Sequence, residues 1–203
     1  MSDNRKIWIT GSRGMLGKRL CSILKSSDNV ILEGNTKIFD QTIQKNVIDW
    51  LKINKPDEII VSSALVGGIN FNLSSSAEFL YKNSMIALNI IQAAHDLDIE
   101  NLVFLGSSCM YPKNATQPIK EGSLNQGEIE FTNESYGIAK ILGVKLIEKI
   151  NSQYNRKYLT IVPTAAFGPG DIYDEKKSHV IPAMIMKFHN AKLNNIKELT
   201  FWG

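Results

Sequence analysis

"IWITGSRGMLG", residues 7–17, is the stretch that decides the fold. Its first four residues, Ile7–Thr10, form a short apolar run of the kind that predicts a buried strand. Gly11, Gly14 and Gly17 follow at intervals of three, and a helical pattern begins among them. Such a glycine pattern by itself also fits a simple tight turn. Between a first strand and a first helix, however, it brings backbone N–H groups to a helix N-terminus, where proteins bind the pyrophosphate of a dinucleotide.

The rest of the chain alternates short apolar runs with helical patterns. The runs are solidly apolar, which is typical of parallel strands buried on both faces. We therefore predict an α/β fold, a doubly wound, mostly parallel sheet of the Rossmann type with helices on both faces. The polar stretch 114–133 is expected to be a long loop. The expected strands are 7–10, 30–32, 58–65, 102–106 and 158–163, and the expected helices are 15–25, 42–53, 76–97, 134–154 and 179–191.

Composition narrows the class of protein. The 203 residues carry a net charge of +3, which is too even a balance to favour nucleic acid or an anionic membrane as the main partner. Two cysteines, Cys21 and Cys109, make no disulfide framework, and no apolar run reaches the roughly 18 residues of a membrane helix. The first residues carry no signal or transit pattern. We expect a cytoplasmic protein with no metal site.

Two signals disagree about which dinucleotide would bind. Glu33 stands 22 positions after Gly11, at the end of the second expected strand, where an acidic residue accepts hydrogen bonds from the ribose of NAD. Arg13 lies in the glycine loop and Lys37 follows the second expected strand, and cations there suit the 2′-phosphate of NADP. The residues by themselves leave both cofactors open.

"NESYGIAK", residues 133–140, places Tyr136 and Lys140 four positions apart on one face of a helix. A nearby ammonium group stabilises a phenolate, so we expect Lys140 to lower the pKa of Tyr136. The pair could equally be a surface pair on an amphipathic helix. The glycine loop and Ser107, at the end of the fourth expected strand, favour a catalytic role.

These motifs resemble the extended short-chain dehydrogenase/reductase superfamily and, within it, the GDP-L-fucose synthase family. The resemblance spans the chain and is carried by the glycine loop and by "VGGI", "FLGSSCMYPK", "QPIKE", "TNESYGIAK", "SHVIPAMIMKFH" and the final "FWG". It implies NADP(H)-dependent 3,5-epimerisation and 4-keto reduction of GDP-4-keto-6-deoxy-D-mannose to GDP-L-fucose, with NAD still possible because of Glu33. The family's activity also makes the expected protein a multifunctional enzyme, both oxidoreductase and isomerase.

The resemblance assigns catalytic roles to five residues. Ser107 and Tyr136 would bind the 4-keto oxygen of the sugar, and Tyr136 would donate its proton. Lys140 would hold the nicotinamide ribose. Cys109 and His179 would be the acid/base pair for epimerisation, although a free cysteine is more often a small buried apolar residue. Ser107 and Cys109 are two apart, so in an extended chain they would point the same way.

Further positions follow from the same resemblance, with no metal ligand among them. Three residues would hold the GDP-sugar, namely Ser108, Lys187 and Trp202. The cofactor positions are Gly11, Ser12, Arg13, Gly14, Met15, Leu16, Gly17, Asp40, Ala64, Leu65, Leu105, Gly106, Ser107, Tyr136, Lys140, Pro163, Thr164, Ala165, Ala166 and His179.

The resemblance also predicts domains and leaves alternatives. Residues 1–178 would form the dinucleotide-binding domain, and 179–203 the beginning of a truncated substrate lobe. Ala165 and Ala166 replace the Asn-Leu that is usual in the family, so a related enzyme acting on a GDP-heptose or a colitose precursor is an alternative. A cofactor-binding module without turnover is another. The apolar helices 76–97 and 134–154 predict a homodimer.

Overall fold

A parallel five-stranded sheet forms the centre of the molecule in the computed structural model, which describes residues 4–25, 28–34, 38–174 and 178–200. The strand order is β2-β1-β3-β4-β5, and every neighbouring pair is parallel. This arrangement confirms the predicted doubly wound α/β fold. The strands are β1 Lys6–Thr10, β2 Val30–Leu32, β3 Glu58–Val61, β4 Asn101–Leu105 and β5 Leu159–Ile161.

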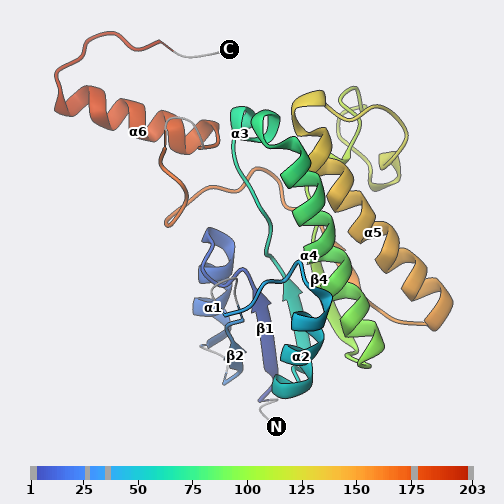
Figure 1. Ribbon diagram of the computed structural model, residues 1–203. Helices are drawn as coiled ribbons and strands as arrows, with labels where there is room; N and C mark the ends of the chain where they lie inside the picture. The colour runs from blue at the N-terminus through green and yellow to red at the C-terminus, as the bar shows by residue number, and fades with distance from the viewer. Residues whose placement is uncertain (1–3, 26–27, 35–37, 175–177, 201–203) are drawn as a thin grey trace.

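Helices cover both sides of this sheet. One side of β1 and β2 packs against α1, and the opposite side of the sheet packs against α2, α4 and α5. Figure 1 shows α4 and α5 side by side, and α6 projecting away from the sheet. The α-helices are α1 Met15–Lys25, α2 Gln44–Asn54, α3 Ile69–Ser74, α4 Ser76–Asp96, α5 Glu134–Tyr154 and α6 Val180–Leu193, and the short 3-10 helices are η1 Ser108–Met110, η2 Glu121–Ser123 and η3 Phe131–Asn133.

Alternation along β1 divides the core between the two sides. Trp8 is fully buried among residues of α2, α4 and α5, whereas Ile7 and Ile9 pack with Cys21 of α1. Successive side chains of a strand point to opposite faces, so one apolar strand supplies both layers. This double burial explains why the run shows no polar alternation.

The elements differ from the prediction in several places. β5 spans only Leu159–Ile161 and does not continue to residue 163. β3 ends at Val61 instead of continuing to residue 65, because the amide of Ser62 donates to the side chain of Thr10 and not to a neighbouring strand. α3 was not predicted at all, since six residues after two glycines give too short a pattern to recognise. The predicted loop 114–133 is largely irregular, as expected, but it contains η2 and η3.

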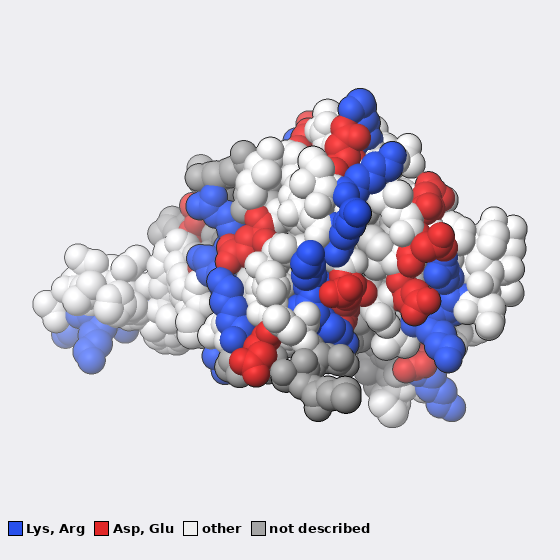
Figure 2. Space-filling view, turned by 90° about the horizontal axis from the view of Figure 1, so that it is seen from below, with Lys and Arg blue, Asp and Glu red and all other residues white. Residues whose placement is uncertain are grey.

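The outer surface carries mixed charge. In the view from below, Lys and Arg side chains lie interspersed with Asp and Glu (Figure 2), as the small net charge implies. None of the helices in the described residues is long and apolar enough to cross a membrane. The same residues contain no group of His, Cys, Asp and Glu placed to bind a metal ion.

Two leucines on neighbouring strands provide a test of this core. Leu102 in β4 is 2% exposed, and Leu159 in β5 is 59% exposed. We expect Leu102→Ala to lower the free energy of unfolding by about 2–5 kcal/mol, because it removes buried apolar surface and leaves a cavity. Leu159→Ala should change it by about 0.5 kcal/mol or less. Urea denaturation of both variants measures the difference, and equal losses would contradict the arrangement of the sheet.

Candidate active site

The glycine loop places the first helix directly on the end of β1. Gly11 has φ of +66°, a conformation that favours glycine, and its carbonyl oxygen accepts from the amide of Gly14 at 2.9 Å. A Cβ on Gly17 would lie 2.1 Å from that same carbonyl oxygen. The close approach therefore requires glycine at both ends of the turn.

Ser12 suits this loop to a dinucleotide. It is 4% exposed, and its hydroxyl has no hydrogen-bond partner in the described structure. A buried polar atom without a partner is costly, so an unpaired hydroxyl beside a helix N-terminus fits a ligand that supplies acceptor oxygens. Arg13 next to it is exposed, as a residue that meets a phosphate from solvent must be.

The end of β2 holds the residues that bear on cofactor choice. Glu33 is exposed and pairs with Lys25 of α1, the Nζ lying 2.9 Å from Oε1. Asp40 accepts hydrogen bonds from the hydroxyl and amide of Thr42, which lower the pKa of its carboxyl group. Lys37, the other predicted cation, lies outside the described residues.

The segment after β3 is held by two residues that sequence reasoning missed. The hydroxyl of Thr10 accepts from the amides of Ser62 and Ser63, both at 3.0 Å. Asn83 of α4 bonds to both backbone groups of Leu65. These partners stand 52, 53 and 18 positions apart in the chain, so no local pattern could have identified them.

Ser107 and Cys109 do not lie in extended chain, which corrects the prediction that alternation makes them point the same way. Ser107 caps the 3-10 helix η1, and its hydroxyl accepts from the amide of Cys109 at 3.2 Å. The turn packs against α5, since a Cβ on Gly137 would lie 2.5 Å from the carbonyl oxygen of Cys109. Contact with α5, not strand alternation, brings this turn beside Tyr136.

Lys140 reaches the end of β4 from inside the protein. Its side chain donates to the carbonyl oxygen of Leu105 at 2.7 Å, and its Nζ lies 5.7 Å from the ring centre of Tyr136. Burial lowers the pKa of Lys140 from 10.5 to about 8.

The pKa of Tyr136 is raised, not lowered as predicted. Burial is the larger cause and the nearby charge of Cys109 the smaller one. The tyrosine is therefore held as a neutral phenol, which keeps its proton available for donation.

The other predicted positions divide into two groups. Ala64, Leu105 and Pro163 follow or end parallel strands, so they lie at the same carboxyl edge as the glycine loop. His179, by contrast, is exposed at the start of α6, and among the described residues its side chain makes no hydrogen bond to Cys109. Its pairing with Cys109 stays a prediction.

Two of the three predicted sugar-binding residues lie within the described structure. Ser108 is exposed in η1, and the Nζ of Lys187 in α6 lies 3.5 Å from the carbonyl oxygen of Thr200. Trp202 lies outside the described residues.

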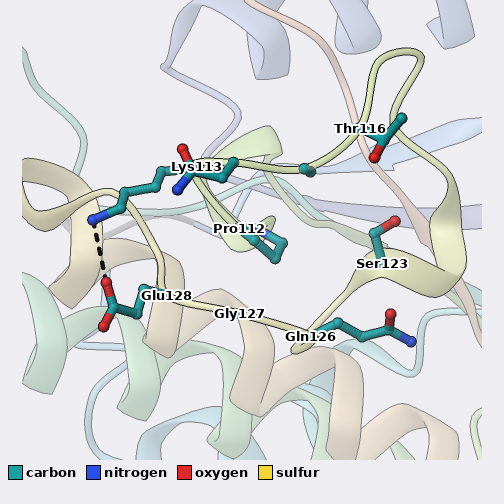
Figure 3. A pocket seen from close by; sticks show the side chains of 9 residues that line it. Pro112, Lys113, Thr116, Ser123, Gln126, Gly127 and Glu128 are labelled. Carbon is teal, nitrogen blue, oxygen red and sulfur yellow. Dashed lines mark hydrogen bonds and ion pairs between the residues drawn. The ribbon is translucent and has the colours of Figure 1, made fainter.

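A cavity of about 370 Å³ lies within the long loop before α5 (Figure 3). Lys113 and Glu128 face one another across its edge, with Nζ and Oε2 3.2 Å apart. Its lining contains none of the predicted catalytic, cofactor or sugar-binding residues. All of its lining residues lie between Pro112 and Glu128.

The fold and this edge define a nucleotide-binding α/β protein with a paired tyrosine and lysine. The chain belongs to the NAD dependent epimerase/dehydratase family, whose pattern matches residues 7–203. It is 42% identical over 202 residues to a GDP-L-fucose synthase of Escherichia coli (strain K12), and 39% identical over 199 residues to a GDP-L-colitose synthase of Yersinia pseudotuberculosis. These stretches cover 99% and 98% of this chain and 63% and 65% of the relatives.

A solved structure shows the same architecture. A GDP-mannoheptose C4 reductase from Campylobacter jejuni with NADP bound superposes with a TM-score of 0.87 at 36% identity, over 97% of this chain and 59% of that one. The chain thus spans less than two thirds of the length of the relatives it matches.

Gly17 gives a test of the glycine loop. We expect Gly17→Ala to lower the free energy of unfolding by about 1–3 kcal/mol, because its Cβ would meet the backbone of Gly11. Helix propensity alone predicts the opposite, a gain of about 1 kcal/mol. Gly122→Ala is the control, since a Cβ there has no atom within 4 Å. Urea denaturation compares the two, and a stabilised Gly17→Ala variant would refute the close contact.

Lys140 gives a test by pH. Its pKa is lower in the folded than in the unfolded chain, so the unfolded chain binds more protons between pH 8 and pH 10.5. This group therefore makes the free energy of unfolding rise with pH, by about 1 kcal/mol between pH 8 and pH 9. Denaturation of the protein and of Lys140→Met at both pH values isolates the effect, which the variant should lack. Lys145→Met, on the exposed side of α5, should keep it.

Proposed function

We propose that this protein is an NADP(H)-dependent nucleotide-sugar epimerase/reductase that converts GDP-4-keto-6-deoxy-D-mannose to GDP-L-fucose. The observation that carries the proposal is the packing of the Ser107–Cys109 turn against Tyr136 and Lys140 at the carboxyl edge of the sheet. The 42% identity to a GDP-L-fucose synthase supports the choice of sugar.

Each residue of this group has a role in the proposed reaction. Cys109 removes the proton at a carbon beside the ketone, and His179 returns one on the opposite face of the sugar. Ser107 binds the 4-keto oxygen, and Tyr136 donates its proton to that oxygen. NADPH, when bound, would supply the hydride. Lys140 holds the nicotinamide ribose. Its hydrogen bond to the carbonyl oxygen of Leu105 restrains the position of the ammonium group.

NADP(H) is the preferred cofactor. Glu33 is the residue that would favour NAD, but its carboxylate is paired with Lys25. Arg13 stands exposed in the glycine loop, where a guanidinium can pair with a 2′-phosphate. The Campylobacter reductase with NADP bound supports the same choice.

A second candidate is a relative that acts on another GDP-linked keto-sugar. Ala165 and Ala166 favour it, because both are exposed just after β5 and small side chains there would change the shape of a sugar site. Similarity to a GDP-L-colitose synthase and to a GDP-mannoheptose reductase also supports it. Binding of the cofactor without turnover is the remaining alternative.

We also propose a cytoplasmic homodimer formed through α4 and α5. The two helices pack on each other and still leave apolar side chains exposed. On α4 these are Leu80 and Tyr81, 36% and 62% exposed, and on α5 they are Ile138 and Leu142, 37% and 41% exposed. A second copy would bury them. Sedimentation analysis that gives a monomer at micromolar concentration would oppose the dimer.

An incubation in D₂O tests the reaction. The protein in its natural full length is mixed with NADPH and GDP-4-keto-6-deoxy-D-mannose. Absorbance at 340 nm follows NADPH, and mass spectrometry measures deuterium in the product. Loss of NADPH with deuterium at the carbons beside the former ketone supports the proposal. Turnover with only a heptose or a colitose precursor would favour the second candidate, and cofactor binding with neither signal would favour the module without turnover.

Cys109→Ser separates the two half-reactions. A hydroxyl is a far weaker acid than a thiol, so we expect deuterium incorporation to fall at least about 100-fold, while some direct reduction of the keto-sugar persists. Cys21→Ala is the control, because Cys21 is buried between α1 and the sheet, where it packs with Ile7 and Ile9 and takes no part in the proposed reaction. Equal loss of epimerisation and reduction in Cys109→Ser would argue against the division of roles.

A further inference from the structure

The side-chain amide of Asn83 makes two hydrogen bonds to the backbone of one residue, Leu65. Its Oδ1 accepts from the amide of Leu65 at 2.7 Å, and its Nδ2 donates to the carbonyl oxygen of Leu65 at 3.0 Å. Asn83 is 4% exposed, so water does not compete strongly for these groups. The ladder of β3 has already ended at Val61, and Asn83 therefore supplies to Leu65 the two bonds that a neighbouring strand would have supplied.

The same segment is tied to the glycine loop on its other side. The hydroxyl of Thr10 accepts from the amides of Ser62 and Ser63 and lies 2.8 Å from the hydroxyl of Ser63. A Cβ on Gly11 would lie 2.8 Å from the Cα of Ser63, so the two chains are in close backbone contact. The segment from Ser62 to Leu65 is thus held between the glycine loop and α4.

Asn83 also connects this segment to the catalytic helix. Phe79 lies one turn before it on α4 and is fully buried. The ring of Phe79 lies 6.5 Å from that of Tyr136 and meets it edge-on. Helix α4 therefore packs against Tyr136 through Phe79 and holds the backbone of Leu65 through Asn83.

We propose that Asn83 is a positioning residue for the dinucleotide. It acts through Leu65, by fixing the backbone of Ala64 and Leu65 at the distance from the glycine loop that the bound cofactor needs. The inference rests on the proposed function, because it requires a dinucleotide at this edge.

The chain contains a matched control in Asn151 of α5. Its Oδ1 accepts from the amide of Tyr158 at 3.0 Å, and its Nδ2 donates to the carbonyl oxygen of Tyr158 at 2.8 Å. Tyr158 stands immediately before β5, at the amino end of the sheet and opposite the glycine loop. The two asparagines thus make the same pair of bonds at opposite ends of the fold.

The experiment compares Asn83→Ala with Asn151→Ala in the full-length protein. NADPH fluorescence titration gives Kd, urea denaturation gives stability, and hydrogen exchange follows the peptide that contains Leu65. We expect both variants to lose stability by similar amounts. Only Asn83→Ala should raise the Kd for NADPH, by at least about tenfold, and only it should lose protection at Leu65. In the proposed reaction, the KM for NADPH should rise more than kcat falls.

The outcomes separate the inference from the proposed function. An unchanged Kd in Asn83→Ala, or an equal rise in both variants, would overturn the role of Asn83 while leaving the proposed function intact. Failure of the unmodified protein to bind NADPH would overturn both. If Asn83→Ala does not fold, Asn83→Asp replaces it, because it keeps an acceptor for the Leu65 amide but loses the donor. Asn151→Asp is then the matched control.

Discussion

The contact between Gly11 and Gly17 is the constraint on which the site depends. With no side chain at residue 17, the first turn of α1 lies directly against the carbonyl oxygen of Gly11. This contact aims the N-terminus of α1 at the carboxyl edge of the sheet and brings the helix down over Ile7 and Ile9. The same contact therefore fixes both the position of the helix N-terminus and the packing of the core on this side of the sheet. A Cβ on Gly17 would disturb both.

The opposite side of the sheet supports the site through buried polar contacts. Lys140 lies 4% exposed among apolar side chains, where an ammonium is unfavourable, and its pKa falls accordingly. Its bond to Leu105 offsets part of that cost. Tyr136 beside it remains a neutral phenol, because burial, and to a smaller extent the nearby Cys109, raise its pKa.

Much of the architecture followed from the sequence. Solid apolar runs and glycine spacing predicted that there are five strands, that they run parallel, and where most helices begin and end to within two residues. The errors arose where contacts are distant in the chain. β3 stops early because Thr10 takes the amide of Ser62, and Ser107 caps a turn because the chain leaves the sheet there. The roles assigned by resemblance to Cys109 and His179 remain predictions.

The sequence by itself determined the class of fold and predicted the residues Ser107, Tyr136 and Lys140 as candidates for the site. These follow from local spacing, since strand and helix periods depend on near neighbours. Only the tertiary structure decided how those residues are held. Asn83 reaches Leu65, and Thr10 reaches Ser63, across 18 and 53 positions. Such bonds form only after the strands have been brought together, so no local pattern encodes them.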